Sequence, residues 1–390
     1  MECLVVAWQL IPSVVLAAPA WRCRNHGLRG HTAAPIPFTC QASWPGSSLA
    51  PRPPTLAATA AAVAVACLLA VATAQGGATL GEVQPARAIP AGYFIHQSVV
   101  VGDCIYVLGG GGGRYVFFTK VQTDGTLAPW QATTPIAEGL GFNYTTAVAH
   151  GRCIYLLGGM YQDAKTGASV TAAAVGIARA KDDGMLGPWQ TTAALPEPRA
   201  GGAAVVAGKY LYYLGGGQQR RVFYAPLLDS GDLGAWKETQ RLISNRCSFS
   251  AFATDRYVYA VGGGIILDRC ADTVFRAALG ADGALGPWRR TEPLPEGLSG
   301  YGGVLVGRDV FLFGGTPARN TVYATTIGAD DHFGPWQTLA PLPFGASTVQ
   351  AVYVNGAVYL TGGMIPNGDG RTAQVLNTVY RIPVRPAPPK

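Results

Sequence analysis

Short apolar runs alternate with polar residues along most of the chain, and this pattern recurs six times. Each repeat contains two adjacent glycines, with an aromatic residue three positions earlier and a residue that tolerates positive φ seven positions earlier. β-Branched and aromatic runs flank that residue, as at 98–101 and 105–108, which predicts a hairpin of two strands, a and b. The glycine pairs begin at Gly109, Gly158, Gly215, Gly262, Gly314 and Gly362.

The second half of each repeat predicts another hairpin. A third apolar run begins at a valine, and in five repeats a tryptophan follows fourteen residues later, after a turn such as Asp124-Gly125. We therefore expect two further strands, c and d. Four strands in about 50 residues is the size of one blade of a β-propeller. The tryptophans are Trp130, Trp189, Trp236, Trp288 and Trp336.

The sixth repeat ends before its tryptophan, and the missing strand is found at the other end of the domain. Segment 80–90 aligns with 333–343, and Val83 precedes Gly109 by 26 residues, the interval that separates Trp336 from Gly362. We expect this N-terminal strand to complete the last blade, because closing the ring removes both open sheet edges. The sequence thus predicts an all-β fold, a six-bladed β-propeller with four antiparallel strands in each blade.

These motifs resemble kelch repeats. The resemblance rests on the glycine pair after an aromatic residue, the later tryptophan and the Leu-Pro phrase of 335–343. The form of 282–288 is similar to the repeats of bacterial secreted kelch proteins. The resemblance covers residues 80–385 and implies a kelch-type propeller. It leaves the activity open, since propellers have unrelated functions.

Composition and charge fit this fold and narrow the function. Charged residues are only 13% of the chain, and glycines number 52. From residue 76 onward, 25 basic and 21 acidic residues give a net charge of +4, which is too dispersed for a nucleic-acid surface. No phosphate loop or dinucleotide motif occurs in a suitable context, so we expect no cofactor. His96, His150 and His332 fall at separate places in the repeat, which argues against a metal site.

The first 75 residues are a different kind of sequence. Glu2 is their only acidic residue, and 56–74 is a charge-free, mostly apolar run that ends in Ala72-Thr73-Ala74. Small residues at that point fit signal-peptidase cleavage before Gln75. We therefore predict a targeting region over 1–75, a propeller domain over 76–390 and a secreted protein. The alternative is that 56–74 is retained as a membrane anchor.

Loop lengths predict where a ligand binds. From each glycine pair to the next valine the repeats count 7, 17, 7, 12, 8 and 17 residues, whereas the a–b and c–d turns are uniform. In a four-stranded antiparallel blade the b–c and d–a loops emerge on the same face. Variable loops on a constant frame indicate a binding face, and neutral variation of surface loops is the alternative.

Arginine and aromatic residues are frequent in these loops. Arginine suits carboxylate or phosphate groups, and aromatic faces suit sugar rings. We expect Arg199 and Arg246 to contribute most, because each lies sixteen residues before its glycine pair, at the start of strand a near the central axis. The full set of predicted ligand-binding residues is Arg199, Arg246, Arg114, Arg220, Arg269, Arg319, Arg371, Tyr93, Tyr144, Tyr301, Asn143 and His96.

Two cysteines also fall on this face. Cys247 opens strand a of the fourth blade, and Cys270 ends the b–c loop of the same blade. We predict a disulfide between them, which an exported protein can form.

The sequence favours an exported, monomeric, non-catalytic recognition module for a protein or glycan ligand, either an anionic carbohydrate or an acidic peptide. Two alternatives stay open. Bacterial sialic-acid mutarotases are six-bladed kelch propellers, and this resemblance implies a cofactor-free sugar isomerase with Glu138, Glu197 or Glu296 as acid–base groups. A structural scaffold that contacts its partners through the outer d strands is the other alternative.

Overall fold

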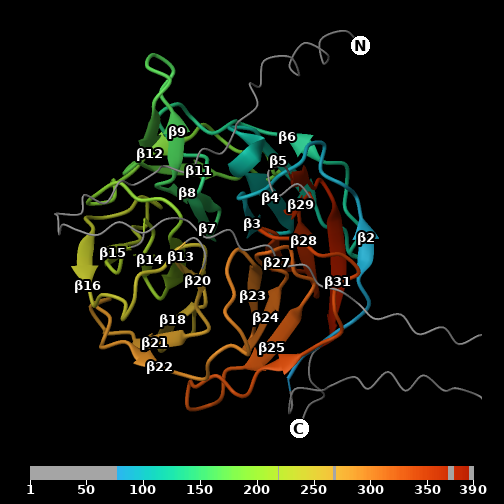
Figure 1. Cartoon of the computed structure of the whole chain (residues 1–390). Helices are drawn as coiled ribbons and strands as arrows, with labels where there is room; N and C mark the ends of the chain where they lie inside the picture. The colour runs from blue at the N-terminus through green and yellow to red at the C-terminus, as the bar shows by residue number, and fades with distance from the viewer. Residues whose placement is uncertain (1–76, 218, 267–268, 368–372, 386–390) are drawn as a thin grey trace, which may run out of the picture. The chain divides into compact units, whose positions relative to one another are not determined.

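The computed structural model describes residues 77–217, 219–266, 269–367 and 373–385, which form a ring of six antiparallel sheets. Figure 1 views this ring along its axis, and the chain passes around it from blade one to blade six. All described residues belong to one unit, Val71–Lys390. The predicted six-bladed β-propeller is confirmed, and the predicted targeting region 1–75 lies outside the described residues.

Each blade contains four main strands, which run in the order a, b, c, d from the axis outward. Blade one is β3 (Gln97–Val101), β4 (Cys104–Leu108), β5 (Val116–Lys120) and β6 (Gln131–Ala132), and blade two is β7 (Thr146–His150), β8 (Cys153–Leu157), β11 (Val175–Arg179) and β12 (Gln190–Thr191). Blade three is β13 (Ala203–Ala207), β14 (Tyr210–Leu214), β15 (Val222–Pro226) and β16 (Lys237–Thr239). Blade four is β17 (Ser250–Ala253), β18 (Tyr257–Val261), β21 (Val274–Ala278) and β22 (Arg289–Arg290), and blade five is β23 (Gly302–Val306), β24 (Asp309–Phe313), β25 (Val322–Thr326) and β26 (Gln337–Thr338). Blade six is β27 (Gln350–Val354), β28 (Ala357–Thr361) and β31 (Val379–Arg385), completed by β1 (Thr79–Leu80) and β2 (Gln84–Ala86).

The N-terminal strands close the ring as predicted. Both β1 and β2 pair antiparallel with β31, and Gln84 stands opposite Arg381. The tryptophans confirm the register. Each tryptophan donates its indole N–H to a main-chain carbonyl in the preceding blade, and the acceptor lies four residues after that blade's own tryptophan. Trp130 of blade one donates to the Arg87 carbonyl, which lies four residues after Val83. Val83 therefore occupies the tryptophan position of blade six.

The glycine pairs join neighbouring blades. In every blade the second glycine donates its N–H to a carbonyl in the d–a loop that enters the next blade, as from Gly315 to Ala346 at 3.0 Å, and the bond from Gly363 to Tyr93 closes the ring. The first glycine faces the same carbonyl. Gly314 has a φ of +66°, and a Cβ atom there would stand 2.6 Å from the Ala346 oxygen. Only glycine fits, since a side chain would meet both an unfavourable φ and the next blade.

The strand-b tyrosines form a second set of bonds between blades. Tyr106 donates its hydroxyl to the Gly184 carbonyl in the c–d turn of blade two, at 2.7 Å, and the equivalent tyrosines of blades two, three, four and six do the same. Blade five has Phe311 at this position. Its neighbour, blade six, has no c–d turn, because its outer strand comes from the N-terminus. The missing hydroxyl thus coincides with a missing acceptor.

Apolar side chains fill the wedges between blades. Within the described residues there are six buried clusters, and each joins two neighbouring blades. The stacked rings of Tyr259 in blade four and Phe333 in blade five, with centroids 5.1 Å apart, are one such contact between blades. The d strands are only two or three residues long, which leaves little free edge for pairing with another chain.

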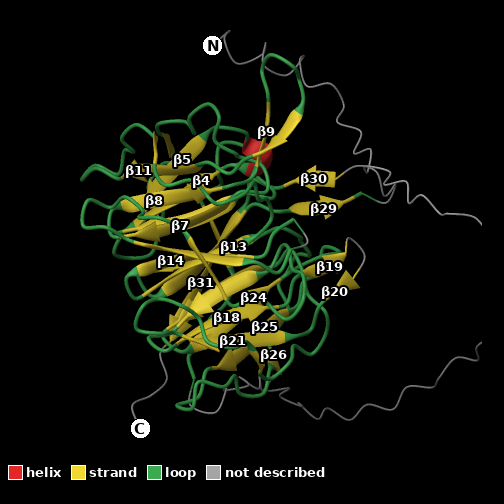
Figure 2. Ribbon diagram, turned by 90° about the vertical axis from the view of Figure 1, so that its left-hand side faces the viewer, coloured by secondary structure: helices red, strands yellow, loops and turns green. Residues whose placement is uncertain are grey.

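Three extra hairpins project from one face of the ring. They are the long b–c loops of blades two, four and six; in Figure 2 the hairpins of blades four and six extend to the right of the blades, and that of blade two rises at the top. Blade one has a short 3-10 turn, Gly110–Gly112, in this place. The hairpins are β9 (Met160–Gln162) with β10 (Ser169–Thr171), β19 (Gly264–Ile266) with β20 (Arg269–Cys270), and β29 (Met364–Pro366) with β30 (Ala373–Val375). We call this side the hairpin face.

Candidate functional site

The hairpins are fixed to the ring by the loops that enter strand a. Asn143, Cys247 and Ser347 stand at equivalent positions, and each forms a short antiparallel bridge with the first residue of the hairpin in its own blade. The Asn143 carbonyl, for example, accepts the Met160 N–H at 2.7 Å. Asn143 is therefore at the base of a hairpin. Blades two, four and six thus carry long hairpins on this face, and blades one, three and five have shorter b–c loops there.

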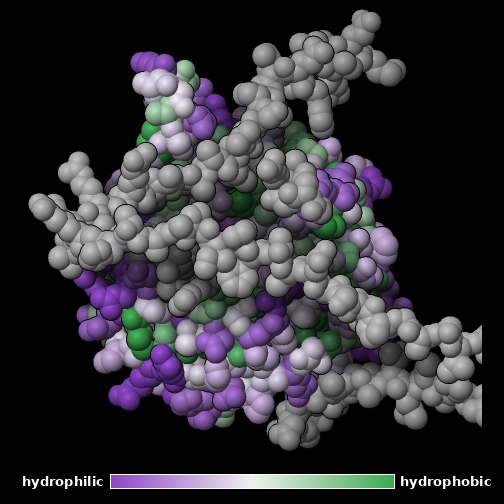
Figure 3. Space-filling model, viewed as in Figure 1, coloured by the Kyte–Doolittle hydropathy of each residue, from purple (hydrophilic) through white to green (hydrophobic). Residues whose placement is uncertain are grey.

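The loops at the mouth of the ring are linked by main-chain bonds. Tyr144, Gly201, Ser248, Gly300 and Thr348 all have positive φ, and each after the first donates its N–H to the carbonyl of the one before it, at 2.6–3.1 Å. Large side chains are confined to blades one and two of this rim, at Ile95 and Tyr144. The mouth is therefore bordered by small residues over blades three to five. Figure 3, which views the hairpin face, shows mainly hydrophilic residues around those blades.

Arg199 and Arg246 lie beneath this surface. Arg246 is 0% exposed, and its guanidinium donates to the carbonyls of Gly262 and Thr273 while it packs over the Phe275 ring at 4.4 Å. Burial lowers the pKa of Arg246 to about 10. Arg199 is also buried and donates to the Gly216 carbonyl at 3.2 Å. Both side chains hold glycine-pair loops in place and are turned away from solvent.

The other predicted arginines differ in their surroundings. Arg114 forms an ion pair with Glu138 at 3.1 Å, Arg319 pairs with Glu296, and Arg220 is exposed. Arg269 lies in β20, but its side chain is outside the described residues, as is the whole of Arg371. Most of the described cations on the hairpin face are therefore neutralised by carboxylates of the protein.

The predicted tyrosines are mostly buried. Tyr93 donates its hydroxyl to the Tyr115 carbonyl at 3.1 Å, and Tyr301 donates to the Val261 carbonyl at 2.6 Å. Burial raises the pKa of Tyr301 to about 12. Tyr144 is 38% exposed, and Tyr115, which the sequence argument missed, is 68% exposed. Tyr115 follows Arg114 in a b–c loop, and this position in the sequence could have identified it.

His96 is fully buried where blade six meets blade one. Its Nε2 lies 3.1 Å from the Thr361 hydroxyl, and its ring makes an edge contact with Tyr93. Burial lowers the pKa of His96 to about 3. The ring is therefore neutral in the folded protein at ordinary pH, and it belongs to the closure between blades.

This burial predicts a pH dependence of stability. The unfolded chain binds a proton at His96 near pH 6.5, whereas the folded protein binds it only near pH 3, so stability is lost as the pH falls through this window. The contribution is at most about 1.4 kcal/mol per pH unit. Urea unfolding at several pH values between about 7.5 and 5 should show a shallower slope for His96→Gln than for the wild type. His150→Gln, at an exposed site, should keep the wild-type slope, and equal slopes in all three proteins would contradict the assignment.

The predicted disulfide between Cys247 and Cys270 is not formed in the structure, where both are free thiols. Cys247 bridges to Gly264, and Gly264 pairs with Cys270, so Gly264 lies between them. Two strand spacings amount to about 9.6 Å, beyond the limit of about 7 Å between Cα atoms for a disulfide. The sequence position placed both residues on the correct face but did not reveal the intervening strand.

The proposed acid–base glutamates are all held by arginine. Glu197 contacts both Arg199 and Arg221, the latter at 2.7 Å. A hydrogen bond from Arg319 lowers the pKa of Glu296. A general acid near neutral pH needs a raised pKa instead. These carboxylates serve as counter-ions for arginine in the structure.

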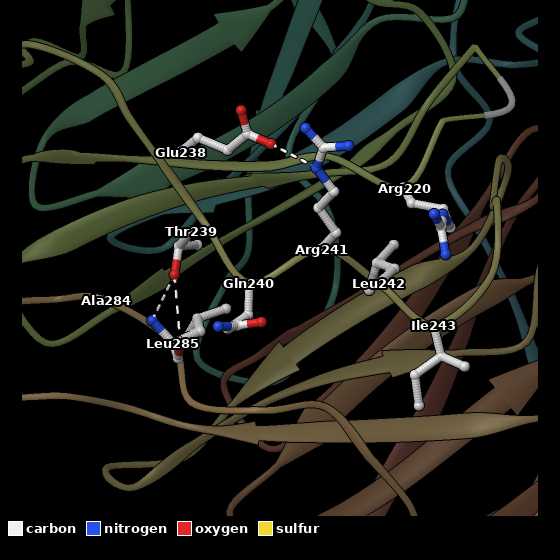
Figure 4. A pocket seen from close by; sticks show the side chains of 9 residues that line it. All are labelled: Arg220, Glu238, Thr239, Gln240, Arg241, Leu242, Ile243, Ala284 and Leu285. Atoms are coloured by element: carbon white, nitrogen blue, oxygen red, sulfur yellow. Dashed lines mark hydrogen bonds and ion pairs between the residues drawn. The ribbon is translucent and has the colours of Figure 1, made fainter.

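An open groove of about 730 Å³ lies on the outer side of the ring between blades three and four. It is formed by Arg220 in the b–c loop of blade three, by β16 and the d–a loop that follows it, and by Ala284 and Leu285 at the end of the c–d turn of blade four. Figure 4 shows Arg220 on the Ile243 side of the groove, away from Glu238, which bonds to Arg241. The lining residues are Arg220, Glu238, Thr239, Gln240, Arg241, Leu242, Ile243, Ala284 and Leu285.

Metal-binding clusters and membrane-spanning helices are both absent from the described residues. In that part of the chain, no group of three or more His, Cys, Asp or Glu residues could hold a metal ion. The same residues include no helix with the length and hydropathy needed to cross a bilayer, and the apolar run 56–74 is not among them.

Comparison with known proteins supports the fold. No family model matches the chain, and no curated protein does. Solved structures do match it, in 691 chains. One is titled "Structure of YjhT"; the match has a TM-score of 0.62 at 14% identity and covers 77% of this chain and 99% of that one. The chain has the fold of a six-bladed β-propeller. At this identity, the similarity carries no information about activity.

Proposed function

We propose that the protein is an exported, kelch-type recognition propeller that binds its ligand on the hairpin face. The observation that supports this most is the distribution of length variation. The long loops occur in blades two, four and six, each contains a pair of short antiparallel strands, and all three are on one face. Surface variation on a constant frame is typical of binding sites.

The opposite face supports the choice by contrast. Its c–d turns accept tyrosine hydroxyls from the preceding blade, and turn aspartates such as Asp282 bond back to nearby main-chain N–H groups. These turns hold the ring together and have little freedom to change. The loops of the hairpin face make fewer such contacts and can vary in sequence with less loss of stability, which suits a ligand-binding surface.

Shortening the hairpins tests the proposal. Replacing 160–171 and 364–375 with short loops copied from blade three should leave the ring folded, because each hairpin lies beyond the glycine pair of its blade. A peptide and glycan array should show binding by the wild type that is lost in this variant. Asp182→Ala, at an exposed c–d turn, is the control and should bind normally. Retained binding by the shortened protein would disprove the role of this face.

A further inference from the structure

Arg220 lacks the ion-pair partner that the equivalent arginine of blade one has. It occupies the position of Arg114 in blade one, and in both cases the arginine carbonyl accepts an N–H from the first apolar residue of the d–a loop, at 2.8 Å. In blade one the residue two positions later is Glu138, which pairs with Arg114. In blade three that residue is Ser244. Within the described part of the chain, the Arg220 side chain has no hydrogen bond or ion pair.

A glutamate occupies this position of the d–a loop before three of the six blades, namely blades two, three and five. Glu138 contacts the arginine of the blade before it, whereas Glu197 and Glu296 contact Arg221 and Arg319 in the b–c loop of the blade that follows. Before blade four the position holds Ser244, which offers no carboxylate to Arg220. A carboxylate from outside the chain can therefore pair with Arg220, because a planar guanidinium binds a carboxylate strongly through two parallel hydrogen bonds.

The charge and hydrophobicity of the other lining residues indicate which class of ligand fits the groove. Glu238 is already neutralised, since Arg221 and Arg241 both bond to it and hydrogen bonding to Arg221 lowers its pKa. The charge of Arg220 is thus available to a ligand. The floor is aliphatic, with Leu242 buried and Ile243 43% exposed. Among the described residues, no aromatic side chain lines the groove and none offers the stacking that sugar rings favour.

We propose that this groove binds an acidic peptide segment in which an aliphatic residue adjoins an aspartate or glutamate. The carboxylate pairs with Arg220, and the aliphatic side chain packs on Ile243 and Leu242. A volume of about 730 Å³ is within the range of ligand pockets. The inference goes beyond the proposed function, because the groove lies on the outer side of the ring and no residue of the three hairpins lines it.

The test uses a fluorescein-labelled peptide with two leucines followed by two aspartates, measured by fluorescence polarisation with the full propeller. Arg220→Ala should weaken binding by roughly tenfold or more, and Arg220→Lys by less, because lysine cannot form the paired bonds. Ser244→Glu should weaken it equally while keeping the arginine, since the new carboxylate copies the arrangement of blade one. Lys237→Ala, which removes a charge from the same blade outside the groove, should bind as the wild type does.

Each other outcome counts against the proposal. Equal binding by wild type and Arg220→Ala would overturn the site. Equal binding of a peptide with asparagines in place of aspartates would overturn the role of the carboxylate. Binding of glucuronic acid, but not the peptide, in an Arg220-dependent way would overturn the ligand class. Absence of peptide binding would overturn the groove while leaving the hairpin-shortening result as a separate test of the hairpin face.

Discussion

Gly314→Ala is expected to cause a large loss of stability, although it adds a single methyl group. The backbone at Gly314 has a φ of +66°, and the new Cβ would stand 2.6 Å from the carbonyl oxygen of Ala346 in the next blade. That carbonyl accepts the Gly315 N–H, so the methyl group would push the two blades apart at the point where they bond. The positive φ costs about 1–2 kcal/mol, and the damaged hydrogen bond adds about 1–3 kcal/mol.

Gly307→Ala separates these two effects. Gly307 is in the same blade, has a φ of +62°, and has no atom within 4 Å of the position of a new Cβ. This variant should lose only the backbone component. Denaturant unfolding of both variants gives the difference directly. A Gly314→Ala protein no less stable than Gly307→Ala would show that the glycine pairs serve turn geometry alone.

Removing the N-terminal strands should open the ring. A chain that begins at Ala88 lacks β1 and β2, so β31 loses its outer partners and the apolar cluster between blades five and six loses Ala78. The expected loss is several kcal/mol, a large part of the roughly 5–15 kcal/mol that stabilises a typical domain. Exposed strand edges should also cause aggregation. Thermal unfolding and size-exclusion chromatography measure the two effects.

A chain that begins at Gln75 is the matched control. It lacks the predicted targeting region but retains both closing strands, and it should melt at the same temperature as the longer chain. If the chain beginning at Ala88 were as stable as this control, the N-terminal strand would not be what closes the ring.

The fold was predictable because each repeated motif makes a contact between neighbouring blades. The glycine pair fits beside the carbonyl of the next blade, and the strand-b tyrosine reaches the next c–d turn. The first contact recurs at all six blade interfaces and the second at five, so the pattern is periodic in sequence. Even the exceptions were informative, since Val83 stands for the missing tryptophan and Phe311 faces the blade without a c–d turn.

The candidate site was less predictable because it depends on side-chain direction. Position in the repeat placed Arg246 correctly in the loop before strand a, but the guanidinium turns inward, to the main-chain carbonyls beside the glycine pair. Repeat spacing does not encode that choice. The importance of Arg220 likewise depends on which neighbour is absent, and only the ion pair of Arg114 in the equivalent position reveals it.

Hydrogen–deuterium exchange with a ligand identified on the array tests the central claim, that the hairpin face is the binding face, most directly. The account predicts that the ligand slows exchange in the hairpins 160–171 and 364–375 and in the d–a loops beside them, with little change in the c–d turns. Protection confined to the c–d turns, at 122–126, 181–185 and 280–284, would place the ligand on the opposite face and contradict the account.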